Sequence, residues 1–308
     1  MRKKLFVLGL GLCLFAVACS GKKVQEEHNS KQSTEENEQK KKKGEDKDDA
    51  EKKDKAQTGT PETNEKEEQD GEDEPGKELS KEPEVTFTDY SRKIEDEDTG
   101  ALLLSVTENC PVISIPENEA VAEKMNMVFE QQHTTNQVDI EKDAELAKDA
   151  YKGLSKEEAS AWRGYNYGVS YKVVYASTKI LSIESQTYQW QQDSEPNTWT
   201  SCYCFDVTTG NLLYLSDIFT DKAKAGKIVE QHILDTITKK PYKDALMEDY
   251  ESYISDILTE DVFYLNEKGL VVICNPNMVT TDTTGAIEIE VPYKELKDVM
   301  KEAYFREP

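Results

Sequence analysis

Residues 20–84 contain no phenylalanine, tryptophan or tyrosine, and Val24 and Leu79 are their only aliphatic side chains larger than alanine. A segment with so little apolar surface cannot offset its own chain entropy, which excludes a packed domain there. The segment carries 14 Lys against 22 Asp and Glu, a net charge of 14 − 22 = −8. We therefore predict a disordered, charged tether.

The N-terminus lacks an apolar run long enough to cross a bilayer. The run Leu5–Val17 is shorter than the roughly 20 residues that a membrane helix needs. It follows the cationic head Met1–Lys4 and precedes Ala18 and Cys19. A short basic head, a short apolar core and small residues before a cysteine are typical of a bacterial lipoprotein signal.

We accordingly predict a signal peptide over residues 1–18, cleavage before Cys19 and lipidation of its thiol. Residues 19–84 would then form the lipid anchor and tether, holding the protein through the membrane on the outer face of the cytoplasmic membrane. The alternative is an ordinary signal peptide with a chance cysteine, since Ala16 stands where lipoboxes more often have leucine.

The rest of the chain has few basic residues. Residues 85–308 carry 21 Lys and Arg against 40 Asp and Glu, so their net charge is 21 − 40 = −19. Such a domain repels phosphates, which excludes nucleic acid as a partner. The same charge would steer a cationic partner toward the domain, although solubility alone also explains an acidic surface.

The familiar catalytic motifs are also missing. The sequence has no His-Glu-x-x-His helix, no Gly-x-Ser-x-Gly elbow and no glycine-rich phosphate loop. Only His133 and His232 occur in the domain, and neither stands in ligand spacing with a cysteine pair, so we predict no metal and no cofactor. A packed or surface role fits His232 better than a catalytic one. We predict that the protein is not an enzyme.

The domain has four cysteines, which allow three full pairings in an oxidising compartment. They are Cys110, Cys202, Cys204 and Cys274. Cys202 and Cys204 share a face of one strand, so a bond to a neighbouring strand fits better than a bond between them. Free, packed thiols are the alternative.

Periodicity predicts an α+β fold with a mainly antiparallel sheet, a central meander and helices packed against it. Strands are expected over 101–106, 112–115, 165–175, 180–190, 199–207, 212–214, 263–265, 270–274 and 287–291. Helices are expected over 117–132, over 140–154 and around Ile228–Ile237, and beginning at Pro241 and at Pro292.

Aromatic side chains mark the meander. Tyrosines alternate with polar residues from Tyr165 to Tyr175, a pattern that suits a core face and also suits a binding platform. Trp190 and Trp199 flank a polar hairpin tip. They are candidates for an exposed aromatic contact, with packing against each other as the simpler alternative.

Short motifs in a fixed order resemble a family of extracytoplasmic domains, and the resemblance spans about residues 86–304. The motifs are Tyr175-Ala176-Ser177 with Leu181-Ser182, Phe205 to Gly210 with Leu215 to Phe219, Leu265 through Gly269 to Val272, and Val291 to Leu296. The family includes the region ahead of the PdaC-type peptidoglycan deacetylase and the ectodomain of the RsiV-type anti-sigma factor, which binds lysozyme. The resemblance implies two intimately associated subdomains: a PdaC-associated one over 85–209 and an RsiV-type one over 210–308.

The sequence departs from the family in two loops, where a ligand would be read. Tyr188 to Asp193 lacks the glycines and histidine of the family's Tyr-x-Gly-Gly-x-His run. Asn275, Pro276, Asn277 and Met278 stand where relatives carry a tyrosine-rich loop. Together with Trp190 and Trp199, these four residues are the predicted binding residues.

Three functions follow as hypotheses. The first is a surface-anchored, non-enzymatic module that recognises peptidoglycan glycan or a cationic muramidase of the lysozyme type. The second is a peptidoglycan-modifying enzyme whose site the sequence does not reveal. The third is an assembly or spacer protein.

Overall fold

The computed structural model describes residues 79–308, except residues 193, 259–261, 282–284 and 306–308. The side chain of Asp256 also lies outside the described part. The predicted signal peptide, Cys19 and the tether up to residue 78 lie outside the described residues. The tether prediction ends too late, because Leu79 is buried in the core and the first strand begins at Glu84. The folded part therefore includes residues 79–84.

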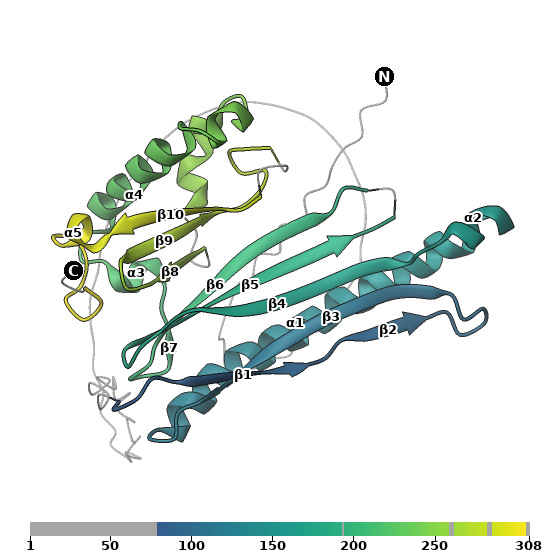
Figure 1. The fold of residues 1–308 in the computed structure, drawn as a ribbon, viewed down its shortest axis with the longest axis horizontal. Coiled ribbons are helices and arrows are strands. Elements are labelled where there is room, and N and C mark those ends of the chain that lie inside the picture. The colour runs from purple at the N-terminus through teal and green to yellow at the C-terminus, as the bar shows by residue number, and fades with distance from the viewer. Residues whose placement is uncertain (1–78, 193, 259–261, 282–284, 306–308) are drawn as a thin grey trace, which may run out of the picture. The chain divides into compact units, whose positions relative to one another are not determined.

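The larger sheet has seven strands in the order β1-β3-β4-β5-β6-β7, with β2 paired to β3 (Figure 1). The strands are β1 (Glu84–Asp89), β2 (Arg92–Glu95), β3 (Leu102–Ser114), β4 (Tyr165–Ala176), β5 (Ile180–Trp190), β6 (Asn197–Asp206) and β7 (Asn211–Leu212). All pairs are antiparallel except β3 with β4, which a helical crossover connects. The predicted α+β class with a mainly antiparallel sheet is confirmed.

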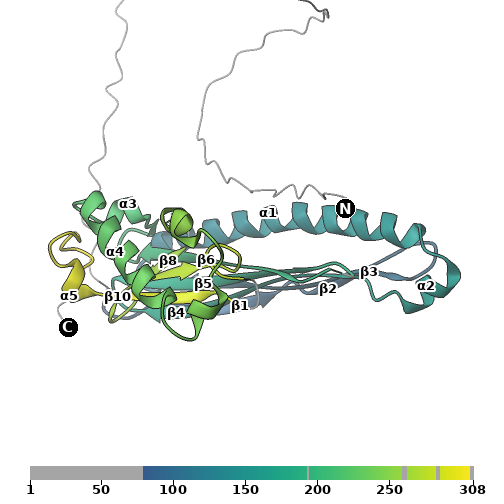
Figure 2. The same cartoon turned by 90° about the horizontal axis from the view of Figure 1, so that it is seen from above.

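One helix, α1 (Glu119–Lys152), covers one face of this sheet (Figure 2). The prediction of two helices, over 117–132 and 140–154, is wrong. Residues 133–139 contain no glycine or proline to end a helix. The hydroxyls of Thr134 and Thr135 donate to carbonyl oxygens one turn earlier, at 2.9 and 3.1 Å, so these polar residues remain helical. A short helix, α2 (Lys156–Ala161), leads into β4.

The tyrosine pattern of β4 faces the core beneath α1. Tyr167, Val169 and Tyr171 are buried, and the ring of Phe129 in α1 meets that of Tyr171 edge-on, with centroids 5.6 Å apart. A register shift between Val173 and Tyr175 then turns the strand, so that Tyr175 packs against a different hydrophobic cluster. Of the two alternatives, the ladder is core and not a platform.

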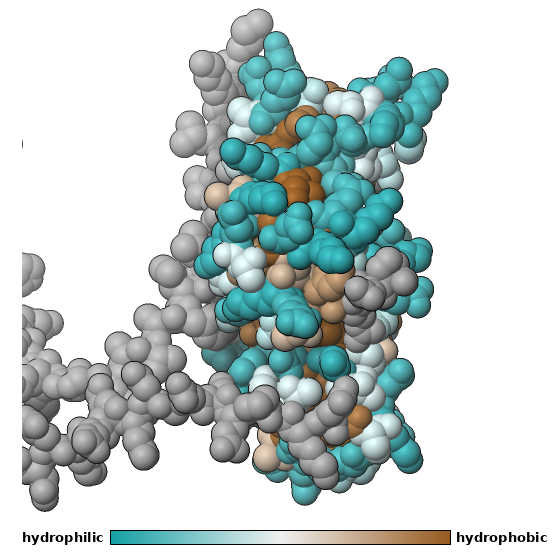
Figure 3. Space-filling view, turned by 90° about the vertical axis from the view of Figure 1, so that its left-hand side faces the viewer, coloured by the Kyte–Doolittle hydropathy of each residue, from teal (hydrophilic) through white to brown (hydrophobic). Residues whose placement is uncertain are grey.

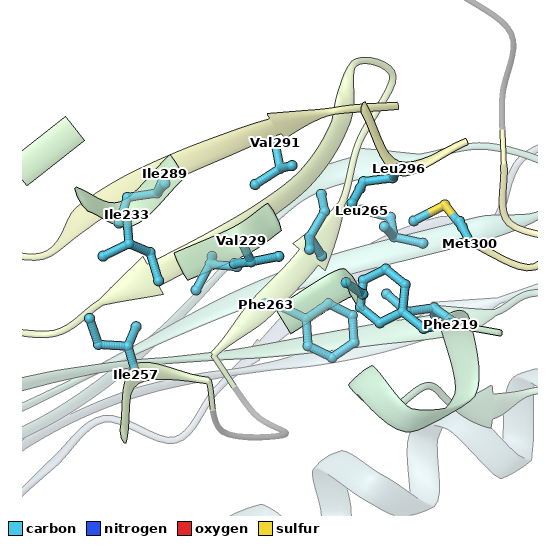
Figure 4. Packing of buried hydrophobic residues seen from close by; sticks show 14 of the residues in the cluster. Phe219, Val229, Ile233, Ile257, Phe263, Leu265, Ile289, Val291, Leu296 and Met300 are labelled. Atoms are coloured by element: carbon cyan, nitrogen blue, oxygen red, sulfur yellow. The ribbon is translucent and has the colours of Figure 1, made fainter. Parts of the chain in front are cut away.

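The smaller sheet has the strand order β10-β9-β8, formed by β8 (Phe263–Leu265), β9 (Gly269–Cys274) and β10 (Ile287–Pro292). Every residue of β8 and β9 is buried, which explains their unbroken apolar sequences. On one face, Val229 and Ile233 of helix α4 (Lys222–Ile237) pack with Phe263 and Leu265 (Figure 4). The short helices α3 (Leu215–Ile218) and α5 (Tyr293–Leu296) complete this cluster.

Two predicted helices are shorter or tighter than expected. In place of the α-helix expected from Pro241, the chain forms the 3-10 helices η1 (Tyr242–Ala245) and η2 (Tyr250–Ile257). Between them, Met247 N–H donates to Val279 O at 2.9 Å, and Asp249 adopts φ 65°. The terminal helix ends at Leu296 because the backbone beyond it pairs with residues around Ile218, including Lys301 N–H to Ile218 O at 2.8 Å. Among the described residues, no helix is long and apolar enough to cross a membrane.

Strand β8 lies against β5 and β6, which joins the two sheets. Ser182 Oγ of β5 donates to Leu265 O of β8 at 2.7 Å. Tyr264, Val271 and Ile273 pack with Cys202 of β6 in the small cluster between the sheets. Strand β7 continues the larger sheet past residue 210, where the second subdomain was predicted to begin. The smaller sheet therefore covers only one end of the β5–β6 surface.

Candidate functional site

The face of the larger sheet opposite α1 is the candidate site. The pairing registers place Thr107, Gly168 and Tyr188 side by side across β3, β4 and β5, and strand alternation adds their neighbours two residues away. We use the term open face for eight residues on this side: Ser105, Thr107, Asn166, Gly168, Ser170, Gln186, Tyr188 and Trp190. In Figures 1 and 2, this side of β3–β5 carries no helix.

A hollow of about 250 Å³ lies on the open face. Gly168 stands at its centre, between Thr107 on one neighbouring strand and Tyr188 on the other. Since glycine adds no side chain, backbone forms the floor of the hollow there. The exposed ring of Tyr188 borders it.

The lining of the hollow is uncharged and combines polar groups with a larger apolar surface. Ser105, Thr107, Ser170, Asn166 and Gln186 contribute hydroxyl and amide groups, and no lining residue is acidic, basic or a histidine. Within the described part of the chain, none of these five side chains makes a hydrogen bond. They are free to bind a ligand with hydroxyl or amide groups.

Charged residues border the open face on two sides: Lys93 of β2 pairs with Ser105 at the β3 edge, and Lys172 and Glu184 lie at one end of β4 and β5. Lys172 Nζ lies 3.2 Å from Glu184 Oε1 across β4 and β5. Trp190, paired with Asn166, lies at the other end of the same two strands. The uncharged strip between them spans six residues of β5, or roughly 20 Å.

The structure separates the two predicted tryptophans. Trp199 pairs with Thr187, whose side chain points to the α1 side, whereas Trp190 points to the open face. The expectation that they pack against each other or form one contact is therefore wrong, because register places them on opposite faces. Trp190 remains part of the candidate site, and Trp199 is 39% exposed on the other side.

The predicted binding loop, residues 275–278, is only partly exposed to solvent. Asn275 is fully buried: its side-chain oxygen accepts from Thr200 N–H at 2.7 Å, and its amide donates to Thr200 O at 2.8 Å. Asn275 is thus corrected from a binding residue to a structural clamp on the edge of β6. Met278 packs against the core of the smaller sheet, Pro276 is partly buried, and Asn277 is exposed with φ 64°.

The four domain cysteines are free thiols, and all are buried. This matches the packed-thiol alternative and not the predicted disulfides. Burial raises the pKa of Cys110 and Cys204 to about 11 and that of Cys274 to about 12. These thiols are therefore protonated and unreactive at neutral pH.

A buried polar cluster under α1 was not predicted from the sequence. Glu108 of β3 is completely buried, and its carboxylate accepts from Asn136 Nδ2 at 2.9 Å and Gln137 Nε2 at 3.3 Å. His133 Nδ1 lies 3.0 Å from the same carboxylate, and the His133 ring stacks on Tyr90 at 4.2 Å. No signal in the sequence indicated it, because Glu108 lies between Thr107 and Asn109, beyond the end of the strand predicted over 101–106.

The remaining titratable groups form no second site. His232 Nε2 lies 2.8 Å from Glu295 Oε2, a side-chain contact at the surface between α4 and α5. In the described ranges, no cluster of histidine, cysteine, aspartate and glutamate has the arrangement of a metal site. The open face combines a hollow with an exposed aromatic ring, and we take it as the candidate site.

Comparison with known families identifies part of the chain. Residues 216–294 match the family described as "Protein of unknown function (DUF3298)". These residues run from α3 through the smaller sheet to the start of α5, and they do not include the open face. This region is thus a domain of unknown function, while the finer resemblance to RsiV-type and PdaC-associated domains stays a prediction.

The chain is similar to two solved structures, the first of which shares its fold. A DUF3298 family member from Bacteroides fragilis NCTC 9343 is similar with a TM-score of 0.54 and 14% identity, over 73% of this chain and 96% of that one. A DUF3298 family protein from Pseudomonas aeruginosa PAO1 gives a TM-score of 0.49 and 11% identity, over 77% of this chain and 99% of that one. No curated protein matches. The first likeness shows a shared fold and says nothing about a ligand.

Proposed function

We propose that the chain is a lipoprotein anchored through Cys19, whose folded domain is a non-enzymatic module that binds cell-wall glycan on the open face. The observation that carries this proposal is the lining of the hollow: free hydroxyls and amides around an exposed tyrosine, with no charge. Aromatic rings stack on the apolar faces of sugars, and uncharged polar groups pair with sugar hydroxyls.

The same lining supports recognition over catalysis. Glycoside hydrolysis needs two carboxyl groups flanking the scissile bond, and general acid or base catalysis needs a titratable group within hydrogen-bond reach. The residues that line the hollow include neither a carboxylate nor an imidazole. A glycan held there would be bound and left intact.

Co-sedimentation with insoluble peptidoglycan tests this function. The full-length protein should pellet with the polymer, should be displaced by a neutral chitin oligomer, and should release no reducing ends or acetate during the incubation. Product formation would contradict a binding-only role, and failure to pellet would remove glycan as the ligand.

The anchor has its own test, which does not depend on the ligand. Radiolabelled palmitate should enter the full-length protein but not its Cys19→Ala variant. A soluble, unlabelled wild-type protein would contradict anchoring.

A cationic muramidase is a second candidate partner, and the charge of the smaller sheet's region favours it. Residues 244–292 contain 11 Asp and Glu and a single Lys, and Tyr253 there is 44% exposed. The side of the domain in Figure 3 is mainly hydrophilic with separate hydrophobic areas. Association with lysozyme should then slow steeply as salt is added. No binding at low ionic strength would remove this candidate.

A further inference from the structure

The fold does not require glycine at position 168. A Cβ built there would lie 3.7 Å from Tyr188 Cβ and 3.8 Å from Thr107 O, which are ordinary contact distances. At Gly269, in contrast, a Cβ would lie 2.1 Å from Val291 O, so the fold excludes any side chain. Gly168 has an ordinary strand backbone with no positive φ.

Glycine at such a position lowers the stability of the strand, and the fold does not need it there. In the interior of a strand it is less favourable than alanine by roughly 0.5–1 kcal/mol, and β-branched residues favour strands further. A strand glycine often marks a place where a ligand approaches the backbone closely. The hollow at Gly168 and the free polar groups around it are consistent with that reading.

We propose that Gly168 keeps open a seat for one pyranose ring of a neutral glycan, which lies on the strand backbone beside Tyr188. This inference rests on the proposed function and names the subsite within the open face. The ring would stack against Tyr188, and the hydroxyls of Thr107 and Ser170 and the amide of Gln186 would pair with its substituents. Gly168 is then the residue that sets the depth of the subsite.

The charge distribution predicts which glycans fit. No charged side chain lines the hollow, and Lys172 and Glu184 at its end neutralise each other. A neutral sugar therefore loses no charge pairing on entry, whereas a sulfated or carboxylated ring finds no cation among the lining residues, with Lys93 beside Ser105 at the β2 edge of the face. Binding of a neutral oligomer should change little between low and high salt.

Calorimetric titration of the full-length protein with chitotetraose, a neutral β-linked tetramer, tests the subsite. Gly168→Val should weaken binding by about tenfold or more, because the branched side chain fills the seat, while the thermal unfolding midpoint stays the same or rises. Tyr188→Leu should weaken binding by about tenfold as well. Gly226→Ala in α4, where a Cβ meets open space, is the matched control and should bind like wild type.

Gly168→Ala tests the same subsite if the valine variant fails to fold, because the structure has room for a single Cβ at this position. Affinity should fall in the order Gly, Ala, Val. If wild type binds chitotetraose and the Val, Ala and Leu variants bind equally well, the seat is refuted while glycan binding stands. If wild type binds neither chitotetraose nor peptidoglycan, the proposed function and this inference both fail.

Discussion

Glu108 shows how a single residue fixes the position of the long helix. Its carboxylate is fully buried on β3 and is contacted by His133, Asn136 and Gln137, which all lie in the middle of α1. A buried carboxylate is tolerated only when donors satisfy it, and these three provide them. Arg92 of β2 extends the network by donating to Gln137 Oε1 at 2.5 Å.

Removing this carboxylate should be costly. Glu108→Ala leaves the buried amide of Asn136 and the partly buried amide of Gln137 without their acceptor, so the free energy of unfolding should fall by about 3 kcal/mol. Glu290→Ala is the control, because its pair with Lys268 is long, at 3.8 Å, and exposed, and it should cost less than about 1 kcal/mol. Urea unfolding of both variants measures the difference. Similar losses would mean that the Glu108 network does not secure α1.

Asn275 connects two elements: it lies in the loop after β9 of the smaller sheet and pairs with β6 of the larger sheet. Its amide pairs with both the N–H and the C=O of Thr200, as a neighbouring strand would. The exposed edge of β6 is thereby covered at this residue, which limits pairing with other chains.

Asn275→Ala should destabilise the protein by about 2–4 kcal/mol, since both backbone groups of Thr200 lose their partners in a buried place. Asn277→Gly in the same loop should be nearly neutral, because Asn277 is exposed and its positive φ suits glycine. Hydrogen exchange at the Thr200 amide provides a second readout and should accelerate only in the alanine variant. Unchanged exchange would argue against the clamp.

Sequence patterns identified the elements better than their arrangement. Alternation located β4, β5 and β6, because one face of each is buried. The face of the sheet on which Trp190 or Trp199 lies depends on the register between β5 and β6. That register depends on the loop between the strands, whose geometry the sequence does not determine. The continuity of α1 and the role of Asn275 depend on tertiary hydrogen bonds that periodicity does not report. Gly168 carried no motif, and only its neighbours across β3 and β5 reveal the hollow.

At the scale of the molecule, buried thiols and phenols make stability depend on alkaline pH. Burial raises the pKa of Cys110 and Cys204 from 9.0 to about 11, and also raises the pKa of Tyr167, Tyr171 and Tyr264. The folded state keeps these protons at pH values where the unfolded chain has lost them. Stability is therefore full below about pH 9 and is lost as pH rises through the folded values.

The urea midpoint should accordingly fall between about pH 9 and pH 11. A Cys110→Ala variant, which removes one of the groups, should show a shallower fall than wild type. A midpoint that stays constant over this range would show that the thiols and phenols are not protected by burial.

The two sheets differ in what they contribute to the molecule. The smaller sheet contributes a compact apolar core and an acidic surface, whereas the larger sheet carries the open face on one side and is closed by α1 on the other. The match to a family of unknown function covers the smaller sheet. The proposed glycan site lies outside the matched residues, so the match alone would not have indicated it.

Selective labelling can locate a glycan bound to the open face. The full-length protein labelled with nitrogen-15 glycine has 15 amide probes, one of them at the floor of the hollow. On addition of chitotetraose, the Gly168 resonance should shift, while those of Gly226 in α4 and Gly285 before β10 should stay in place. Shifts at Gly226 or Gly285 with none at Gly168 would contradict binding on the open face.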